Sequence, residues 1–135
     1  MTGLPTTQQK RAKHAWDTVT AARGRFGGAA WDEFNGHVKR LGPRIIIAGL
    51  GPAVAFIAAK ESPDYLLLNQ LSAWLLRSAD PKDTNRDLQQ KIMSGTSDDL
   101  RLWTAEALEW LVWVKRFCEA AGKTETAENK PGTIR

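Results

Sequence analysis

The spacing of apolar positions predicts helices along nearly the whole chain. The most regular pattern lies at residues 97–121, where apolar side chains recur at the period of one helix face. That face consists of Leu100, Trp103, Ala107, Trp110, Leu111, Val114 and Cys118. Short oxygen-bearing side chains at 97–99 can accept hydrogen bonds from the first helical amides, and Gly122 is typical of a helix end. We expect this helix to be the longest and to anchor the core.

Shorter amphipathic stretches predict four more helices, over residues 7–23, 29–41, 65–77 and 84–93. Thr6 or Thr7 caps the first of them, and Gly42-Pro43 ends the second. The apolar positions of the first helix, expected to face inward, are Ala12, Ala15, Trp16, Val19 and Ala22.

Residues 44–60 contain three isoleucines followed by a glycine-rich turn, which resembles a strand entering a nucleotide-binding loop. Val54 replaces the third glycine of that fingerprint, and Pro52 lacks an amide that would bind phosphate. No other strand-like run exists with which a parallel strand could pair. We therefore interpret the segment as a short buried helix, a turn, and a helix with Pro52 at its first position.

These elements predict an all-α fold: a compact single-domain bundle of six to seven helices, the last one longest, with a disordered C-terminal tail. Its divisions are a flexible N-terminus at 1–5, a helical bundle domain at 6–121 and the tail at 122–135. The sequence has no apolar run of membrane-spanning length and no secretory signal. Cys118, the single cysteine, is expected to be a buried small hydrophobe, and the location to be cytoplasmic.

Positive charge is concentrated in the first part of the chain. Residues 1–60 carry a net charge of +6, whereas the whole chain carries +4. Lys10, Arg11 and Lys13 crowd the start of the first helix, where cations oppose the helix dipole. The excess indicates a surface that attracts phosphate or an acidic protein, or simply a solvated surface.

The sequence offers no catalytic or metal-binding pattern. His14 and His37 fall in separate helices and lack the spacing of metal ligands, and neither has a neighbouring nucleophile. Glu106 and Glu109 have no Glu-x-x-His companion and are interpreted as facing solvent. We predict no metal, no cofactor and no enzymatic activity, which leaves a binding or scaffolding protein.

Leu102 and Trp113 lie among charged residues on the face of the last helix opposite its apolar stripe. Another helix of the same chain could cover them, as happens for helices with a wide apolar face. Alternatively, they form a contact patch for a partner subunit.

Four segments occur in the order found in one known family. They are Gln9 with Ala12, Gly49-Leu50 before Ala55-Phe56-Ile57, Leu71-Ser-Ala-Trp74-Leu75, and Thr104-Ala-Glu106-Ala-Leu108-Glu-Trp110-Leu111-Val-Trp113-Val-Lys115-Arg116-Phe117. Over residues 6–121 the chain thus resembles the small helical-bundle subunit of the Cmr (type III-B) CRISPR RNA-guided effector complex. Pro52 and the basic, glycine-rich residues 23–28 depart from the family pattern.

The resemblance implies a non-catalytic structural subunit that stacks with copies of itself along the backbone filament in antiviral defence. Its implied partners are the backbone and large subunits, guide RNA and target RNA. We name six cations as the hypothetical RNA-binding face, each of which could equally be a solubilising charge: Lys10, Arg11, Lys13, Arg44, Lys115 and Arg116. Leu102 and Trp113 are the hypothetical subunit interface. The alternatives are a stand-alone helical nucleic-acid-binding regulator and a protein-only adaptor.

Overall fold

The computed structural model describes residues 3–59, 64–77 and 84–129 of the 135-residue chain. Within these ranges there are six helices and no strand, and the last helix is the longest, which confirms the predicted all-α bundle. The helices are α1 (Thr7–Arg25), α2 (Gly28–Ala48), α3 (Leu50–Ala58), α4 (Asp64–Leu76), α5 (Thr84–Ser94) and α6 (Ser97–Asn129).

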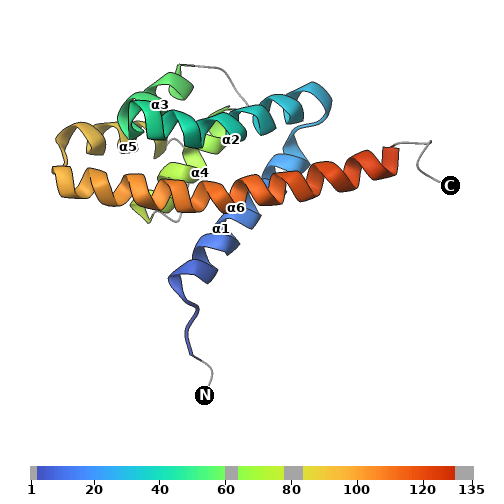
Figure 1. Ribbon diagram of the computed structural model, residues 1–135, viewed down its shortest axis with the longest axis horizontal. Helices are drawn as coiled ribbons and strands as arrows, with labels where there is room; N and C mark the ends of the chain where they lie inside the picture. The colour runs from blue at the N-terminus through green and yellow to red at the C-terminus, as the bar shows by residue number, and fades with distance from the viewer. Residues whose placement is uncertain (1–2, 60–63, 78–83, 130–135) are drawn as a thin grey trace.

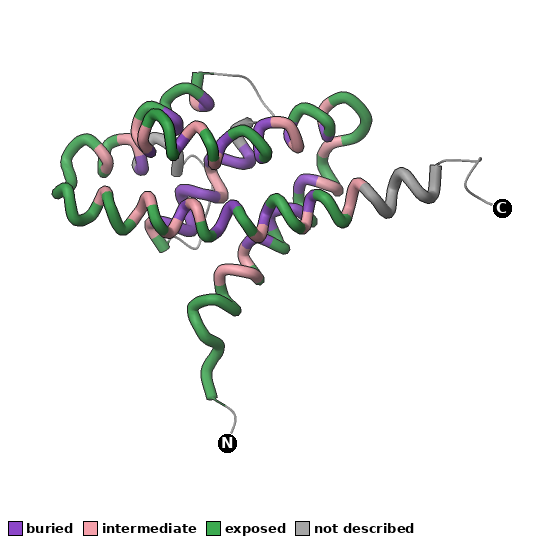
Figure 2. Tube along the Cα trace, viewed as in Figure 1, coloured by how far each residue is buried: buried purple, intermediate pink, exposed green. Residues whose placement is uncertain are grey.

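Helix α6 runs along the length of the bundle and packs against α1, α2, α3 and α4 (Figure 1). Helix α2 lies beside it, and α1 crosses it at a steep angle so that the N-terminal end of α1 projects from the bundle. The predicted apolar face of α6 is confirmed, because Ala107, Trp110 and Val114 have no exposed surface. From residue 97 to residue 122, the outward side of α6 consists of exposed and half-buried residues (Figure 2).

Helix α4 lies in the centre of the bundle. Its buried residues are Leu66, Leu67, Leu68, Leu71, Ser72, Ala73, Trp74 and Leu75. A helix that is apolar around most of its circumference is stable only when other helices surround it. The contacts of α4 with α1, α2, α3, α5 and α6 provide that environment.

Reciprocal hydrogen bonds define two helix starts. At α1, Thr6 Oγ1 accepts from the Gln9 amide at 3.0 Å, and the Thr6 amide donates to Gln9 Oε1 at 2.7 Å. At α6 the capping residue is Thr96, one residue before the predicted acceptors. Its hydroxyl accepts from the Asp99 amide at 3.0 Å, and its amide donates to the Asp99 carboxylate at 3.3 Å.

The predicted end of the second helix at Gly42-Pro43 was wrong. Helix α2 continues through Pro43 to Ala48, so the isoleucine run forms its last turns and is not a separate buried helix. Leu41 and Ile45, on either side of Pro43, are both buried on the same face. Continuing the helix buries both side chains, which outweighs the loss of one amide donor at Pro43.

A single residue, Gly49, joins α2 to α3. Its φ of 97° lies in a region that glycine adopts without steric cost, and this bends the chain sharply. The Gly49 amide donates to the Ile45 carbonyl of α2, and the Gly49 carbonyl accepts from the Ala53 amide of α3. Consequently α3 begins at Leu50, and Pro52 is not at its first position.

Helix α6 also continues past the predicted end at Gly122 and extends to Asn129. The remaining residues of the predicted tail, 130–135, lie outside the described part of the chain. The same holds for residues 1–2 of the predicted flexible N-terminus.

Candidate interaction surfaces

Lys10 and Lys13 lie exposed on the projecting end of α1 (Figure 1). The first turn of α1 contains no acidic residue, so no carboxylate there offsets the positive end of the helix dipole. Lys13 binds both carboxylate oxygens of Asp17 at 2.8 Å, in a pair whose side chains are largely in solvent. Such an exposed pair is weak, so Lys13 remains available to another anion.

Arg11, the third cation of that cluster, points into the bundle. Its Nε donates to Glu106 Oε2, and its second guanidinium nitrogen donates to Glu106 Oε1 at 2.9 Å. The Trp74 indole donates to the same carboxylate at 2.8 Å, so Glu106 joins α1, α4 and α6. The prediction that Glu106 faces solvent was therefore wrong. The hydrogen bond from Arg11, with a further one from Trp74, holds the pKa of Glu106 below its usual value against the opposing effect of burial.

His14 lies beside this pair, between two tryptophans. Its ring centroid is 5.3 Å from that of Trp74 and 5.8 Å from that of Trp110. The Trp110 indole donates to His14 Nδ1 at 3.0 Å, which requires that nitrogen to be unprotonated. Burial lowers the pKa of His14; Asp17 opposes this change and Arg77 adds to it. The histidine is thus a neutral acceptor between the helices.

Arg44 contacts an aromatic ring of the neighbouring helix. Its guanidinium carbon lies 3.9 Å from the centroid of the Phe56 ring, a cation–π contact between α2 and α3. Arg44 is half-buried, whereas Phe56 is exposed. This contact fixes the direction of the guanidinium, which remains accessible at the surface.

Lys115 and Arg116 are both exposed on α6. Lys115 does not lie on the side of α6 that packs against α1. It lines a groove with α2, whereas Phe117, two residues later, contacts Trp16 of α1 at 5.2 Å between ring centroids. Two residues correspond to about 200° of rotation around a helix. The structure therefore does not gather the six predicted cations on one continuous face.

The two predicted interface residues differ in their surroundings. Leu102 is 65% exposed, and none of the described helices covers it. Trp113 is half-buried, packs against the core, and lies 5.7 Å from Phe117 between ring centroids. Trp16, which was expected to face inward, is 53% exposed on the other side of Phe117.

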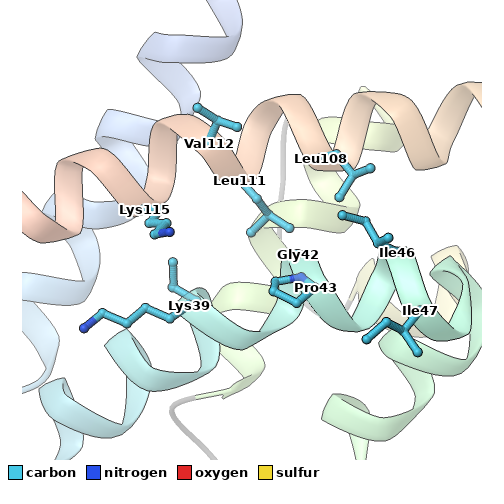
Figure 3. A pocket seen from close by; sticks show the side chains of 10 residues that line it. Lys39, Gly42, Pro43, Ile46, Ile47, Leu108, Leu111, Val112 and Lys115 are labelled. Carbon is cyan, nitrogen blue, oxygen red and sulfur yellow. The ribbon is translucent and has the colours of Figure 1, made fainter.

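An apolar groove, which sequence reasoning missed, lies between α2 and α6, and we call it the α2–α6 groove. It has a volume of about 440 Å³ and is lined by Val38, Lys39, Gly42, Pro43, Ile46, Ile47, Leu108, Leu111, Val112 and Lys115. Figure 3 shows the two lysines at one end and Ile46, Ile47 and Leu108 at the other. Its main sequence signal was the isoleucine run, which was interpreted as core.

The described residues contain neither a metal-binding cluster nor a membrane span. No group of three or more His, Cys, Asp or Glu side chains among them is arranged to hold a metal ion. None of the described helices is long and apolar enough to cross a membrane. Cys118 is buried as predicted, and burial raises the pKa of its thiol to about 12.

Comparisons with known proteins give a consistent result. The chain matches a solved structure described as a CRISPR-associated Cmr5 family protein from Thermus thermophilus, with 27% identity and a TM-score of 0.72. That match covers 86% of this chain and 97% of the other. No curated protein sequence matches the chain. The sequence model of the family described as CRISPR-associated protein (Cas_Cmr5) matches residues 7–121, which include all of α1 to α5 and most of α6, so the chain belongs to that family.

Proposed function

We propose that this protein is a non-catalytic structural subunit of a type III-B CRISPR (Cmr) ribonucleoprotein effector in the cytoplasm. The family match over residues 7–121 carries the proposal, since it spans almost the whole helical bundle. In this role the subunit stacks along the backbone filament with copies of itself and contacts guide or target RNA. Its partners are the backbone and large subunits of the complex.

The exposed cations support an RNA contact that is independent of sequence. Lys10, Lys13 and Arg116 extend into solvent, and Arg44 is accessible above Phe56. Lysine and arginine contacts with phosphate release counterions and do not read bases. This suits a subunit of a complex in which base pairing with the guide selects the target. Arg11 contributes less, because Glu106 already neutralises it inside the bundle.

Leu102 and Trp113 are the proposed contacts with a neighbouring subunit. Leu102 is 65% exposed, which supports its role as a contact with a neighbouring subunit. Trp113 has its own packing against Phe117, so only its solvent-facing side is available. Trp113→Glu should impair assembly while the isolated chain stays helical by circular dichroism. A collapse of helicity would assign Trp113 to the core alone.

The RNA contact is tested by titrating single-stranded RNA at several salt concentrations. Replacing Lys10 and Arg116 with Glu should weaken RNA binding. The slope of log K against log salt concentration should become shallower by about 1.4, because each phosphate that is no longer neutralised removes about 0.7 from it. Lys91→Glu with Arg40→Glu is the matched control, because both residues are exposed and neither is among the proposed RNA contacts. Sequence-selective binding to duplex DNA would instead indicate a stand-alone regulator. Absence of RNA from the assembled complex would indicate a protein-only adaptor.

A further inference from the structure

The α2–α6 groove exposes more apolar surface than a lone subunit needs. Ile46 is 71% exposed and Ile47 is 85% exposed, on the last turns of α2. Leu108 of α6 points toward Ile46 from the other helix (Figure 3), and Val112 of α6, which also lines the groove, is 56% exposed. Covering large aliphatic side chains removes apolar surface from water, so a contiguous group of this kind favours association.

Charge is distributed unevenly around the groove. Lys39 of α2 and Lys115 of α6 lie together at one end (Figure 3). No lining residue is acidic, so neither ammonium has a counterion in the groove itself. A ligand that fills the groove therefore gains from carrying a carboxylate at this end and apolar groups along the rest.

RNA does not fit this combination. The two lysines would attract phosphate, but the remaining lining residues are aliphatic or glycine and proline. Single-stranded nucleic acids bind through aromatic side chains on which bases stack, along a continuous basic track. The groove has neither, which points to a protein ligand.

A second copy of this chain does not fit well either. Among the described residues outside the groove, the most exposed large apolar side chains are Leu4, Met93 and Leu102. The last two lie on either side of the α5–α6 turn. The acids beside them, 98–99, are balanced by Lys91 and by Arg101, which pairs with Asp98 at 3.1 Å. That corner offers no net negative charge to the two lysines of the groove.

We propose that the α2–α6 groove binds an amphipathic helix from a different protein, with an apolar face and an Asp or Glu at one end. The apolar face covers Ile46, Ile47 and Val112, and the carboxylate pairs with Lys39 and Lys115. Proteins commonly bind an amphipathic helix by laying its apolar face into a hydrophobic groove between two helices. The inference rests on the proposed function, since the other subunits of the effector complex supply the helix.

The occupant can be identified by placing the photocrosslinking residue p-benzoylphenylalanine at position 47 in the reconstituted complex. The expected product is a crosslink to a segment of another subunit in which apolar residues recur at helical spacing beside an acid. A crosslink to a second copy of this chain, a crosslink to RNA, or no crosslink in the intact complex would overturn the inference.

Substitutions test the same contact without a probe. Ile47→Glu should reduce incorporation into the complex at least about tenfold, whereas the control Leu4→Glu, at a similarly exposed residue before α1, should assemble normally. Lys39→Glu with Lys115→Glu should weaken assembly, and replacing the acid of the crosslinked segment with Lys should restore it. Arg40→Glu, on α2 but outside the groove, is the charge control.

The two proposals fail in different ways. If the wild-type chain does not enter the effector complex, the proposed function fails and the inference fails with it. If Ile47→Glu enters the complex as well as the wild type, the inference is refuted while the proposed function stands.

Discussion

The Arg11–Glu106 pair should contribute measurably to the stability of the bundle. The two side chains retain only 13% and 19% of their exposure, and Glu106 also accepts from Trp74. Hydrogen bonds to charged groups contribute about 1.5–3 kcal/mol each, and breaking a fully buried ion pair costs about 3–5 kcal/mol. Because water still reaches this pair in part, we expect Glu106→Ala to lower the free energy of unfolding by about 3 kcal/mol.

A double-mutant cycle separates the pair from its surroundings. Arg11→Met, Glu106→Ala and the double variant are compared by chemical denaturation, and the expected coupling is about 1.5–2 kcal/mol. The Lys13–Asp17 pair of α1 is the matched control, because its side chains are 71% and 56% exposed. Its coupling should stay at about 0.3–0.5 kcal/mol, as for other exposed pairs one helix turn apart.

Acid titration provides a second readout. The folded-state pKa of Glu106 is held below its unfolded value, so its stabilisation is fully present above about pH 4.3 and disappears as the pH falls through the folded pKa. The coupling should disappear over the same range. A coupling at pH 7 no larger than that of Lys13–Asp17 would refute the role assigned to Glu106.

Three further predictions concern single residues. Because the folded-state pKa of His14 is lowered, the unfolded chain takes up the proton first, so the free energy of unfolding should fall as the pH drops below about 6.5; His14→Gln should remove that fall. Cys118, with its pKa raised to about 12, should react with a thiol reagent at pH 8 only as the chain unfolds, and reaction at the rate of the denatured protein would contradict its burial. Gly49→Ala should destabilise the fold by about 1–3 kcal/mol because of its positive φ, whereas Gly24→Ala, where an added methyl meets no atom, should not. Thermal unfolding of the two glycine variants decides this, and equal melting temperatures would refute the strain at Gly49.

The periodicity of apolar residues predicted those helices whose buried face is visible in their own sequence. The stripe through Trp110 and Val114 is long enough that only a buried helix face explains it, and α6 was therefore predicted correctly at its start. Pro43 led to a wrong prediction, because a proline usually ends a helix. Helix α2 continues through Pro43 because Leu41 and Ile45 are both buried when it does. Their burial depends on contacts with helices that are distant in sequence.

The candidate surfaces were less predictable for the same reason. Arg11 and Glu106 are 95 residues apart, and no local pattern indicates that one cation of a basic cluster pairs with a distant carboxylate. Ile46 and Ile47 were predicted to be buried, because an isoleucine that stays exposed at the surface is indistinguishable in sequence from one that faces the core. Leu102, by contrast, stood out among charges and is indeed exposed.

The length of α6 has a mechanical consequence. Its 33 residues form one uninterrupted helix of about 50 Å at 1.5 Å per residue. Leu102 and Lys115 are therefore held about 20 Å apart on a single stiff rod. In the proposed assembly the subunit would therefore act as a spacer, because α6 sets the distance between a neighbour bound at Leu102 and a ligand bound at Lys115.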